Sequence, residues 1–416
     1  MSQLSDAIRR SSLRLPAFGR DAWLFLASVI IAGVAFSIYQ LYFNLYVLSL
    51  GLGKEFLGLL AAIPAGVTLV LGLPIGVLAD RIGRRAALLL GNFGVAAAIV
   101  LLTSSPSPII MVVASLLLGV SQAIFILSIA PFIMRVSKEE TRTALFSAQF
   151  GLSILSGFVG SLLAGQLPGW FAGLLAVGVE SPPAYRAAIL ISALLTFASN
   201  LPLWFVRESP PAERTTHVDI GLGGLWAQLK RPLVIKLIVP NIFVGFGAAI
   251  LIPYMNVFFK ERYAMPDNQL GLLFSLTAVA TGVATLLGPR LARSLGKVRA
   301  VVFTQAASLV FMMAIGFVPG VLLASAAFFM RSALMNMGGP LYQAFSMEQV
   351  PDHERATLNS AQTLVWEMGW AFGPAVSGFV QQRFGFAPLF VATTALYGVA
   401  AVLTYAFFHN METKKI

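Results

Sequence analysis

The sequence contains no cysteine and few charged residues. None of its 416 residues is Cys, and only 11% are charged. The lack of cysteine excludes disulfide bonds, thiolate catalysis and cysteine metal sites, so a redox function is not expected. A soluble domain usually carries about a quarter charged residues. A chain of this length with so few charges cannot cover its apolar surface in water, which excludes a soluble globular protein.

Long hydrophobic runs take the place of the missing charge. Hydrophobic residues make up 58% of the chain, and its mean hydropathy is +0.84. Apolar runs of about 20 residues recur, each long enough as a helix to cross a hydrocarbon layer of roughly 30 Å. The runs are continuous rather than alternating, which indicates helices and not a barrel. We predict twelve spans, at residues 22–49, 56–79, 86–104, 108–134, 143–167, 185–206, 232–259, 269–290, 299–318, 321–347, 357–381 and 386–408.

Basic residues gather on one side of these spans. One set of connecting segments carries 22 of the 28 Lys and Arg residues, and the other set carries 5. The positive-inside rule places the basic set, and with it both termini, in the cytoplasm. The net charge of +11 is then explained by the membrane, and no nucleic-acid partner is expected. The sequence therefore predicts a multi-pass protein of the plasma (inner) membrane.

The chain repeats itself at a shift of about half its length. At 212 or 213 positions the matches are Gly58 with Gly271, Gly83 with Gly296, Gly160 with Gly373, Gly165 with Gly378, Arg142–Gln149 with Arg355–Gln362, and Tyr42–Val47 with Tyr254–Phe259. This pattern indicates a duplicated six-helix unit. We predict an N-terminal bundle at 1–206, a polar cytoplasmic linker at 207–231 and a C-terminal bundle at 232–416.

After the second span the chain reads GLPIGVLADRIGRR, from Gly72 to Arg85. This segment resembles the signature of the major facilitator superfamily, and the residues that carry the resemblance are Gly76, Asp80, Arg81, Gly83 and Arg84. With the duplication and the linker, the resemblance covers essentially the whole chain and extends to the twelve-helix drug/proton antiporters. It implies an all-α membrane protein of twelve transmembrane helices in two pseudo-symmetric six-helix bundles, working as a secondary transporter by alternating access.

The signature loop is a candidate gating element. Gly76 and Gly83 permit close packing and a sharp turn, while Asp80 at a helix end can meet the positive N-terminus of another helix. The resemblance implies that this partner is the start of the eleventh span, near Thr357, and that the contact holds the cytoplasmic side shut. Alternatively, the loop is only a basic cytoplasmic turn. The second copy has Arg293 in place of the aspartate, so no symmetric latch is expected there.

Two charged residues lie well inside predicted spans. Arg331 is in the tenth span and Glu367 is in the eleventh, both near the middle of the membrane. A charge there costs about 2.5–3.5 kcal/mol on insertion scales, so such a residue usually faces a cavity or a partner. We expect Glu367 to titrate and to couple proton movement to substrate movement, with Arg331 as its partner. The alternative is a static ion pair.

Amides and aromatic residues mark a candidate substrate cavity. Gln40 and Asn44 share one stripe of the first span, and Asn256 matches Asn44 in the seventh. Such amides contact a substrate or only bond neighbouring helices, and the sequence leaves both readings open. The full set of candidates is Gln40, Asn44, Gln122, Asn256, Asn336, Trp366 and Trp370.

The expected function is secondary active transport of a small organic solute, first as proton-coupled efflux of lipophilic compounds. The alternatives are uptake of a sugar, organic acid or other nutrient and, in another class, a non-transporting receptor or structural protein. No nucleophile-base or metal-ligand constellation is present, so an enzyme is not expected. The expected partners are a small-molecule substrate, membrane lipids and protons. We expect a monomer with no metal and no cofactor.

Overall fold

The structure, a computed structural model, describes residues 18–207 and 231–412. Every regular element in these ranges is a helix, as the composition predicts. The predicted linker lies outside the described residues except for its two ends, Arg207 and Arg231.

Each predicted span coincides with one helix or with two or three consecutive helical segments. In the first half of the chain these are α2 (Arg20–Ser49), α3 (Lys54–Ile82), α4 (Arg84–Ser104), α5 (Pro108–Val136), α6 (Glu139–Ala164), α7 (Leu167–Leu175), α8 (Pro182–Ala198) and α9 (Asn200–Trp204). In the second half they are α11 (Pro232–Leu251), η1 (Ile252–Tyr254), α12 (Met255–Tyr263), α13 (Asp267–Leu295), α14 (Lys297–Phe317), α15 (Val321–Glu348), α16 (Asp352–Phe384) and α17 (Ala387–Glu412).

Within the described ranges, eleven helical segments are long and apolar enough to cross a membrane. The predicted span at 357–381 falls in α16, which has 33 residues but is less apolar than the others and is not among the eleven. The helix prediction is thus confirmed throughout, and eleven of the predicted spans have the length and hydropathy that crossing a membrane requires.

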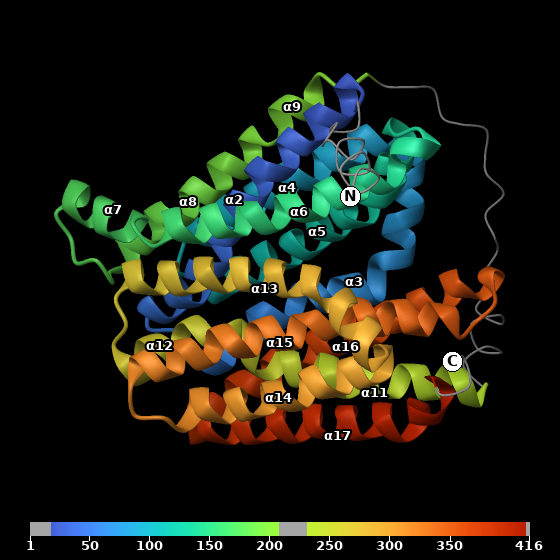
Figure 1. The fold of residues 1–416 in the computed structure, drawn as a ribbon. Helices are drawn as coiled ribbons and strands as arrows, with labels where there is room; N and C mark the ends of the chain where they lie inside the picture. Colours follow the sequence, from blue (N-terminus) through green and yellow to red (C-terminus); the bar gives the residue numbers. More distant parts are fainter. Residues whose placement is uncertain (1–17, 208–230, 413–416) are drawn as a thin grey trace, which may run out of the picture.

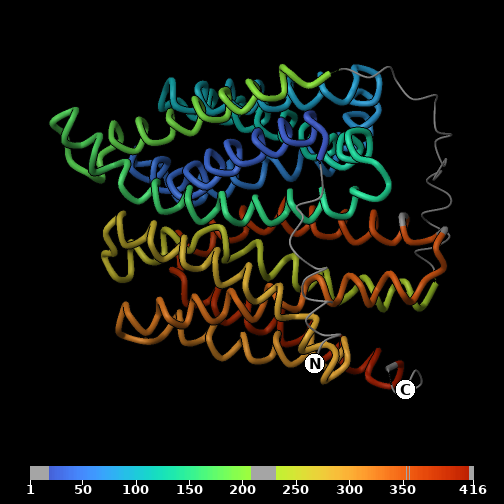
Figure 2. The backbone as a smooth tube through the Cα atoms, turned by 45° about the horizontal axis from the view of Figure 1, so that its top comes forward, coloured from blue at the N-terminus to red at the C-terminus, as the bar shows by residue number. Residues whose placement is uncertain are grey.

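The helices of residues 20–204 and those of residues 232–412 occupy different parts of the molecule. Figure 1 shows most of the first half above and the second half below, although α3 reaches down past α13 toward α16, and the turned view in Figure 2 agrees with this division. Both halves run between the same two ends. We name the end with the turns at Gly83 and Gly296 the basic end, and the opposite end, with α7 and α12, the far end.

The buried side chains show that the core common to the two halves lies toward one end. A single hydrophobic core around Tyr42, Leu57, Tyr254 and Phe259 takes in residues of both halves toward the far end. Toward the basic end each half has its own core. One is built around Phe132 in the first half, and the other around Phe345 in the second. The halves therefore share apolar burial at the far end and are separately packed at the basic end.

Candidate functional site between the two halves

Asn44 of α2 and Asn256 of α12 form a reciprocal contact where the halves meet. Asn44 Nδ2 donates to Asn256 Oδ1 at 2.9 Å and to the carbonyl of Pro253 at 2.6 Å. Asn256 Nδ2 donates in turn to the carbonyl of Leu41 at 2.8 Å. Each amide thus reaches the carbonyl three residues before its counterpart, and both asparagines are buried. We call this contact the amide clamp.

The clamp depends on a break between α11 and α12. Leu251 and Tyr254 leave helical geometry, with φ of −128° and −106°. Val257 N–H then donates to Asn256 Oδ1 at 2.9 Å, although in a continuous helix it would bond the carbonyl of Pro253. This leaves the Pro253 carbonyl for Asn44. The side chain of Asn256 therefore both replaces a helix hydrogen bond and exposes the acceptor that the first half uses.

Two close helix contacts stand beside the clamp, and repeat-related glycines make both of them. Gly58 of α3 packs on Gly378 of α16, where a Cβ on Gly58 would lie 3.1 Å from the Gly378 Cα. Gly165 packs on Gly271 of α13, where a Cβ on Gly165 would lie 3.0 Å from the Gly271 Cα. Small residues let helix backbones approach this closely in membranes. The sequence repeat pairs the same four glycines, but it does not indicate that they meet across the halves.

Ion pairs surround the far end and cross between the halves. Lys260 Nζ lies 2.6 Å from Glu180 of the first half and 2.7 Å from Asp267. Asp267 is buried, and Tyr185 of the first half donates to its Oδ1 at 3.4 Å. Further pairs join Lys54 to Glu261 at 2.6 Å and Arg383 to Glu55 at 3.5 Å. The sequence placed these charges at span ends without pairing them, because residue spacing does not tell which loops lie side by side.

The predicted gating loop is formed, but its predicted contact is not. Gly83 makes the turn between α3 and α4 with φ of +93°, as predicted. Asp80 pairs with Arg84 one turn away and not with the start of α16. A Cβ on Gly76 would meet nothing within 4 Å, so the predicted close packing at Gly76 is absent in this conformation. Arg81 lies at the last turn of α3. In the second half, Lys297 pairs instead with Glu348 at the end of α15.

Arg331 and Glu367 are not paired with each other. Arg331 is buried, with 4% of its surface exposed, and its Nη2 donates to the Tyr397 hydroxyl at 3.1 Å. Its Nε has no hydrogen-bond partner among the described residues. The static ion pair that the sequence allowed is therefore not formed here. Arg331 lies inside the second half, between α15 and α17.

Glu367 points toward the division between the halves. It is half-buried, and its helix face also carries Pro374 and Gly378, seven and eleven residues farther on, which pack on α3. No described residue is its hydrogen-bond or ion-pair partner. On α3, a Cβ on Gly66 would meet nothing within 4 Å, so the tight contact seen at Gly58 does not continue there. Glu367 therefore lies on the basic-end side of the contact between Gly58 and Gly378, and its carboxyl has no partner among the described residues.

Two indole rings lie close to Glu367 in sequence on the same helix. Trp366 and Trp370 have ring centroids 6.2 Å apart, and Trp366 is 40% exposed. The Nε1 of Trp370 is buried without a partner among the described residues. This part of α16 therefore carries both an acid and aromatic surface, which a cationic or lipophilic solute can use.

The remaining amides divide into two groups. Asn44 and Asn256 are committed to the clamp, which is the helix-bonding alternative. Gln40, one turn from Asn44 toward the basic end, is exposed and unbonded, and Gln122 is half-buried and unbonded among the described residues. Asn336 is exposed and donates only to the Ser332 carbonyl of its own helix, at 2.8 Å. These three side chains remain available to a solute.

No metal site is evident in the part of the chain that the structure describes. Within residues 18–207 and 231–412 no three His, Asp or Glu side chains gather as a metal ion would need.

A family comparison covers the whole set of helices. The family model described as Major Facilitator Superfamily matches residues 24–366 and 237–416.

Similar proteins have been found both by sequence and by structure. The chain is 23% identical over 405 residues to the multidrug resistance protein MdtG of Dickeya zeae, covering 95% of each chain. Its fold resembles that of a bacterial homologue of the human lysosomal transporter Spinster in an inward-facing and occupied conformation, with a TM-score of 0.76, 15% identity and coverage of 92% and 95%. It also resembles an inward-facing bacterial homologue of the iron transporter ferroportin, with a TM-score of 0.74, 16% identity and coverage of 93% and 98%.

Breaking the amide clamp is expected to open the far end. The chain has no native cysteine, so Ser161→Cys, on the buried face of α6 against Gly271, provides a single reporter thiol. Asn256→Ala removes two hydrogen bonds to the first half, each worth about 0.6 kcal/mol in membrane proteins, so maleimide labelling of that thiol should accelerate roughly five- to tenfold.

The matched control is Asn92→Ala. Asn92 is also buried, but it donates to Ser199 within the first half, at 3.0 Å. Its removal should leave the labelling rate of the reporter unchanged. Equal acceleration of labelling by both substitutions would mean that either one loosens helix packing in general. Labelling that Asn256→Ala does not accelerate would contradict a role of the amide clamp in closing the far end.

Proposed function

The chain belongs to the Major Facilitator Superfamily of transporters, and from this premise we propose that it exports lipophilic, in particular cationic, compounds in exchange for protons. The observation that carries the proposal is the unpaired Glu367 carboxyl, on the face of α16 that turns toward the first half and next in sequence to the ring pair of Trp366 and Trp370. The name of a relative that matches along 95% of this chain, a multidrug resistance protein, supports the same solute class.

We propose that α16 also crosses the membrane, which completes the twelve spans, and that the helices form two six-helix bundles, at 1–206 and 232–416, joined by a linker at 207–231. Three contacts support this arrangement because each is made by residues that the repeat relates. Asn44 meets Asn256, and the contact of Gly58 with Gly378 is matched by that of Gly165 with Gly271. An axis passing between two copies of one unit brings equivalent residues together in this way.

We further propose that the basic end lies in the cytoplasm, with both termini. The excess of Lys and Arg in the segments at that end supports this orientation. The conformation is then closed to the outside by the clamp, the glycine contacts and the ion pairs, and open toward the cytoplasm. The inward-facing conformations named for two similar folds agree with this interpretation.

Export requires the protein to alternate between a conformation closed at the far end and one closed at the basic end. In the conformation described, a cytoplasmic solute reaches Glu367, Trp366 and the available amides. When the two bundles rock, the far end opens and the basic end closes. Asp80 is then free to leave Arg84 for the start of α16, the contact that this conformation lacks.

The proton and the cationic solute compete for the same carboxyl. At the outside, Glu367 accepts a proton and the solute leaves, and the protonated acid then returns to the cytoplasmic side. There the proton is released, and the carboxylate is ready for the next cation. One proton thus enters for each cation that leaves through this group, because a carboxyl holds only one of them at a time.

Replacement of Glu367 by glutamine is expected to uncouple transport. In liposomes with an imposed pH gradient, Glu367→Gln should reduce proton-driven accumulation of a lipophilic cation at least about tenfold, because the amide cannot exchange a proton. Gradient-independent exchange should persist only for a neutral lipophilic solute, because the amide lacks the negative charge that binds the cation. The control Glu139→Gln, an exposed acid in the first turn of α6, should transport as the native chain does.

The same assay separates the rival functions. Proton-driven accumulation of a sugar or an organic acid, in the direction that runs from the outside to the cytoplasm, would favour nutrient uptake. Full gradient-driven movement by Glu367→Gln would contradict the assignment of this residue.

The orientation has its own test in intact cells. A single cysteine at Ser104, exposed at the far end, should react with a membrane-impermeant maleimide added outside. One at Ser294, exposed at the basic end, should react only after the membrane is permeabilised. The reverse order of labelling would mean that the chain is inserted the other way.

A further inference from the structure

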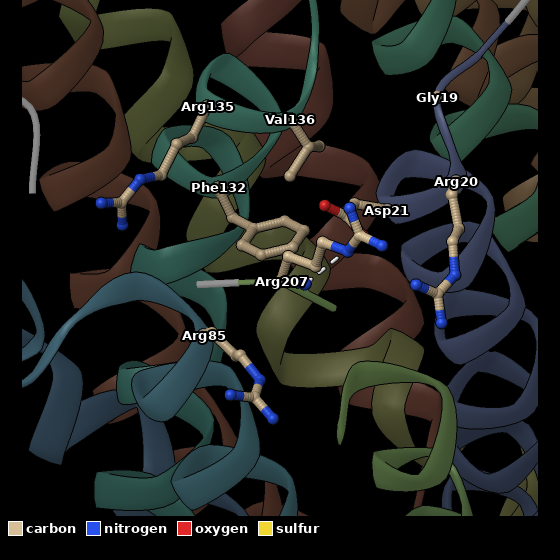
Figure 3. Close-up of a pocket in the computed structure, with 8 residues that line it drawn as sticks. All are labelled: Gly19, Arg20, Asp21, Arg85, Phe132, Arg135, Val136 and Arg207. Atoms are coloured by element: carbon tan, nitrogen blue, oxygen red, sulfur yellow. Dashed lines mark hydrogen bonds between the residues drawn. The ribbon is translucent and has the colours of Figure 1, made fainter. Parts of the chain in front are cut away.

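A positively charged pocket lies at the basic end, within the first half of the chain. It has a volume of about 300 Å³ and is lined by Gly19, Arg20, Asp21, Arg85, Phe132, Arg135, Val136 and Arg207. Figure 3 shows Arg207 beside Asp21 and the ring of Phe132, with Arg20, Arg85 and Arg135 around them. Four arginines and one aspartate thus line the pocket. None of these residues belongs to the solute site around Glu367.

Helix ends hold this pocket in shape. Arg20 and Asp21 begin α2, Arg85 lies in the first turn of α4, and Phe132 forms a buried wall near the end of α5. Arg85 Nε donates to the Leu203 carbonyl at 3.1 Å, and its Nη2 donates to the Trp204 carbonyl at 2.5 Å. These carbonyls end α9, so the arginine ties α4 to a helix C-terminus, where a cation is favoured.

The single acid in the pocket is already engaged. Asp21 Oδ1 accepts the backbone N–H of Arg207 at 3.4 Å, which positions the start of α2 against the end of the first half. The side chains of Arg20 and Arg207 are exposed. An excess of guanidinium over carboxylate suits an anion with several acceptor oxygens, and phosphate matches the fork geometry of arginine best. Such a pocket repels the cationic solutes proposed for the transport site.

Large exposed aromatic side chains stand next to the pocket in sequence. Trp23 is 48% exposed, Trp204 63% and Phe205 64%, each within three residues of a pocket arginine. Exposed tryptophan in a membrane protein marks the level of the lipid headgroups. The pocket therefore opens at the depth where the phosphates of one leaflet lie, with apolar surface beside it for an acyl chain. Basic pockets between helices on the cytoplasmic side hold anionic headgroups in other proteins.

We propose that this pocket binds the phosphate of an anionic phospholipid from the leaflet at the basic end, with Arg20 and Arg207 as its direct ligands. The phosphodiester accepts from the guanidinium groups, and Trp23 and Trp204 pack along the upper part of an acyl chain. The lipid would then join the starts of α2 and α4 to the ends of α5 and α9. The proposal concerns binding alone and does not depend on what the chain transports.

The test measures lipid binding by the purified full chain. Native mass spectrometry would follow retention of phosphatidylglycerol, with phosphatidylcholine as the neutral comparison and glycerol 3-phosphate as the soluble phosphate ester. We expect the native chain to retain phosphatidylglycerol in preference to phosphatidylcholine. The double variant Arg20→Gln with Arg207→Gln should weaken retention of phosphatidylglycerol at least about fivefold, since each lost charge-assisted hydrogen bond to phosphate counts for more than a neutral one.

A matched double variant removes the same charge from the same end. Arg290→Gln with Arg293→Gln lies on the last turns of α13, outside the pocket, where both arginines are exposed. This variant should keep native retention. Equal loss in both double variants would overturn the pocket in favour of general attraction by a basic surface.

Two further readouts keep the outcome decisive. The thermal stability of the double variant in phosphatidylcholine alone should equal that of the native chain, which separates lost binding from lost folding. Should it fall, the single variant Trp204→Ala takes its place and is expected to weaken retention of the lipid but not of glycerol 3-phosphate. Glycerol 3-phosphate that binds as well as the lipid, in the native chain and in Trp204→Ala, would overturn the lipid as the source of the phosphate.

Discussion

The contact between Asn44 and Asn256 is the interaction on which the conformation of this protein depends. It joins the two halves in a buried place where an unpaired amide would be costly, so the asparagines favour each other over the apolar surroundings. The contact exists because α11 ends one turn early. A proline and a three-residue 3₁₀ segment release a backbone carbonyl that a continuous helix would have consumed. A local defect in one helix thus becomes the attachment point for another.

Three kinds of contact surround this point at the far end, from the buried interior to the exposed rim. The amides are innermost, the glycine contacts bring α3 against α16 and α6 against α13, and the ion pairs lie toward the rim. Exposed ion pairs contribute at most about 1 kcal/mol each, and a hydrogen bond between membrane helices about 0.6 kcal/mol. Many interactions of small free energy therefore hold the far end closed. The free energy of binding one solute and one proton is enough to open such an end. The separate cores at the basic end allow each half to move intact.

Much of the fold could be predicted from the sequence because the length and hydropathy of a short stretch are enough to identify a membrane helix. Length and hydropathy predicted every helical segment, although α16 shows the limit of this signal. Its polar residues place a long helix below the hydropathy of its neighbours, and they are also what makes it a candidate for the site. The repeat was visible as well. The repeat also indicates which residues meet, since two residues equivalent under duplication, such as Asn44 and Asn256, come together near an axis between the copies.

The contacts within the site could not be predicted in the same way, because periodicity gives the face of a side chain and not its partner. Depth in the membrane pairs Arg331 with Glu367, but Arg331 turns toward Tyr397 within the second half. The resemblance pairs Asp80 with the start of α16, but Asp80 bonds Arg84 in this conformation. The Asp80 contact depends on how the halves are tilted, because its predicted partner lies in the other half.

Distances between spin labels test most directly whether the amide clamp sets this tilt. One pair of labels at Ser104 and Asn268 spans the far end, and another at Lys138 and Ser294 spans the basic end. Introducing Asn44→Ala with Asn256→Ala should lengthen the first distance and shorten the second together; a longer far-end distance with an unchanged basic end, or no change at either, would contradict the account.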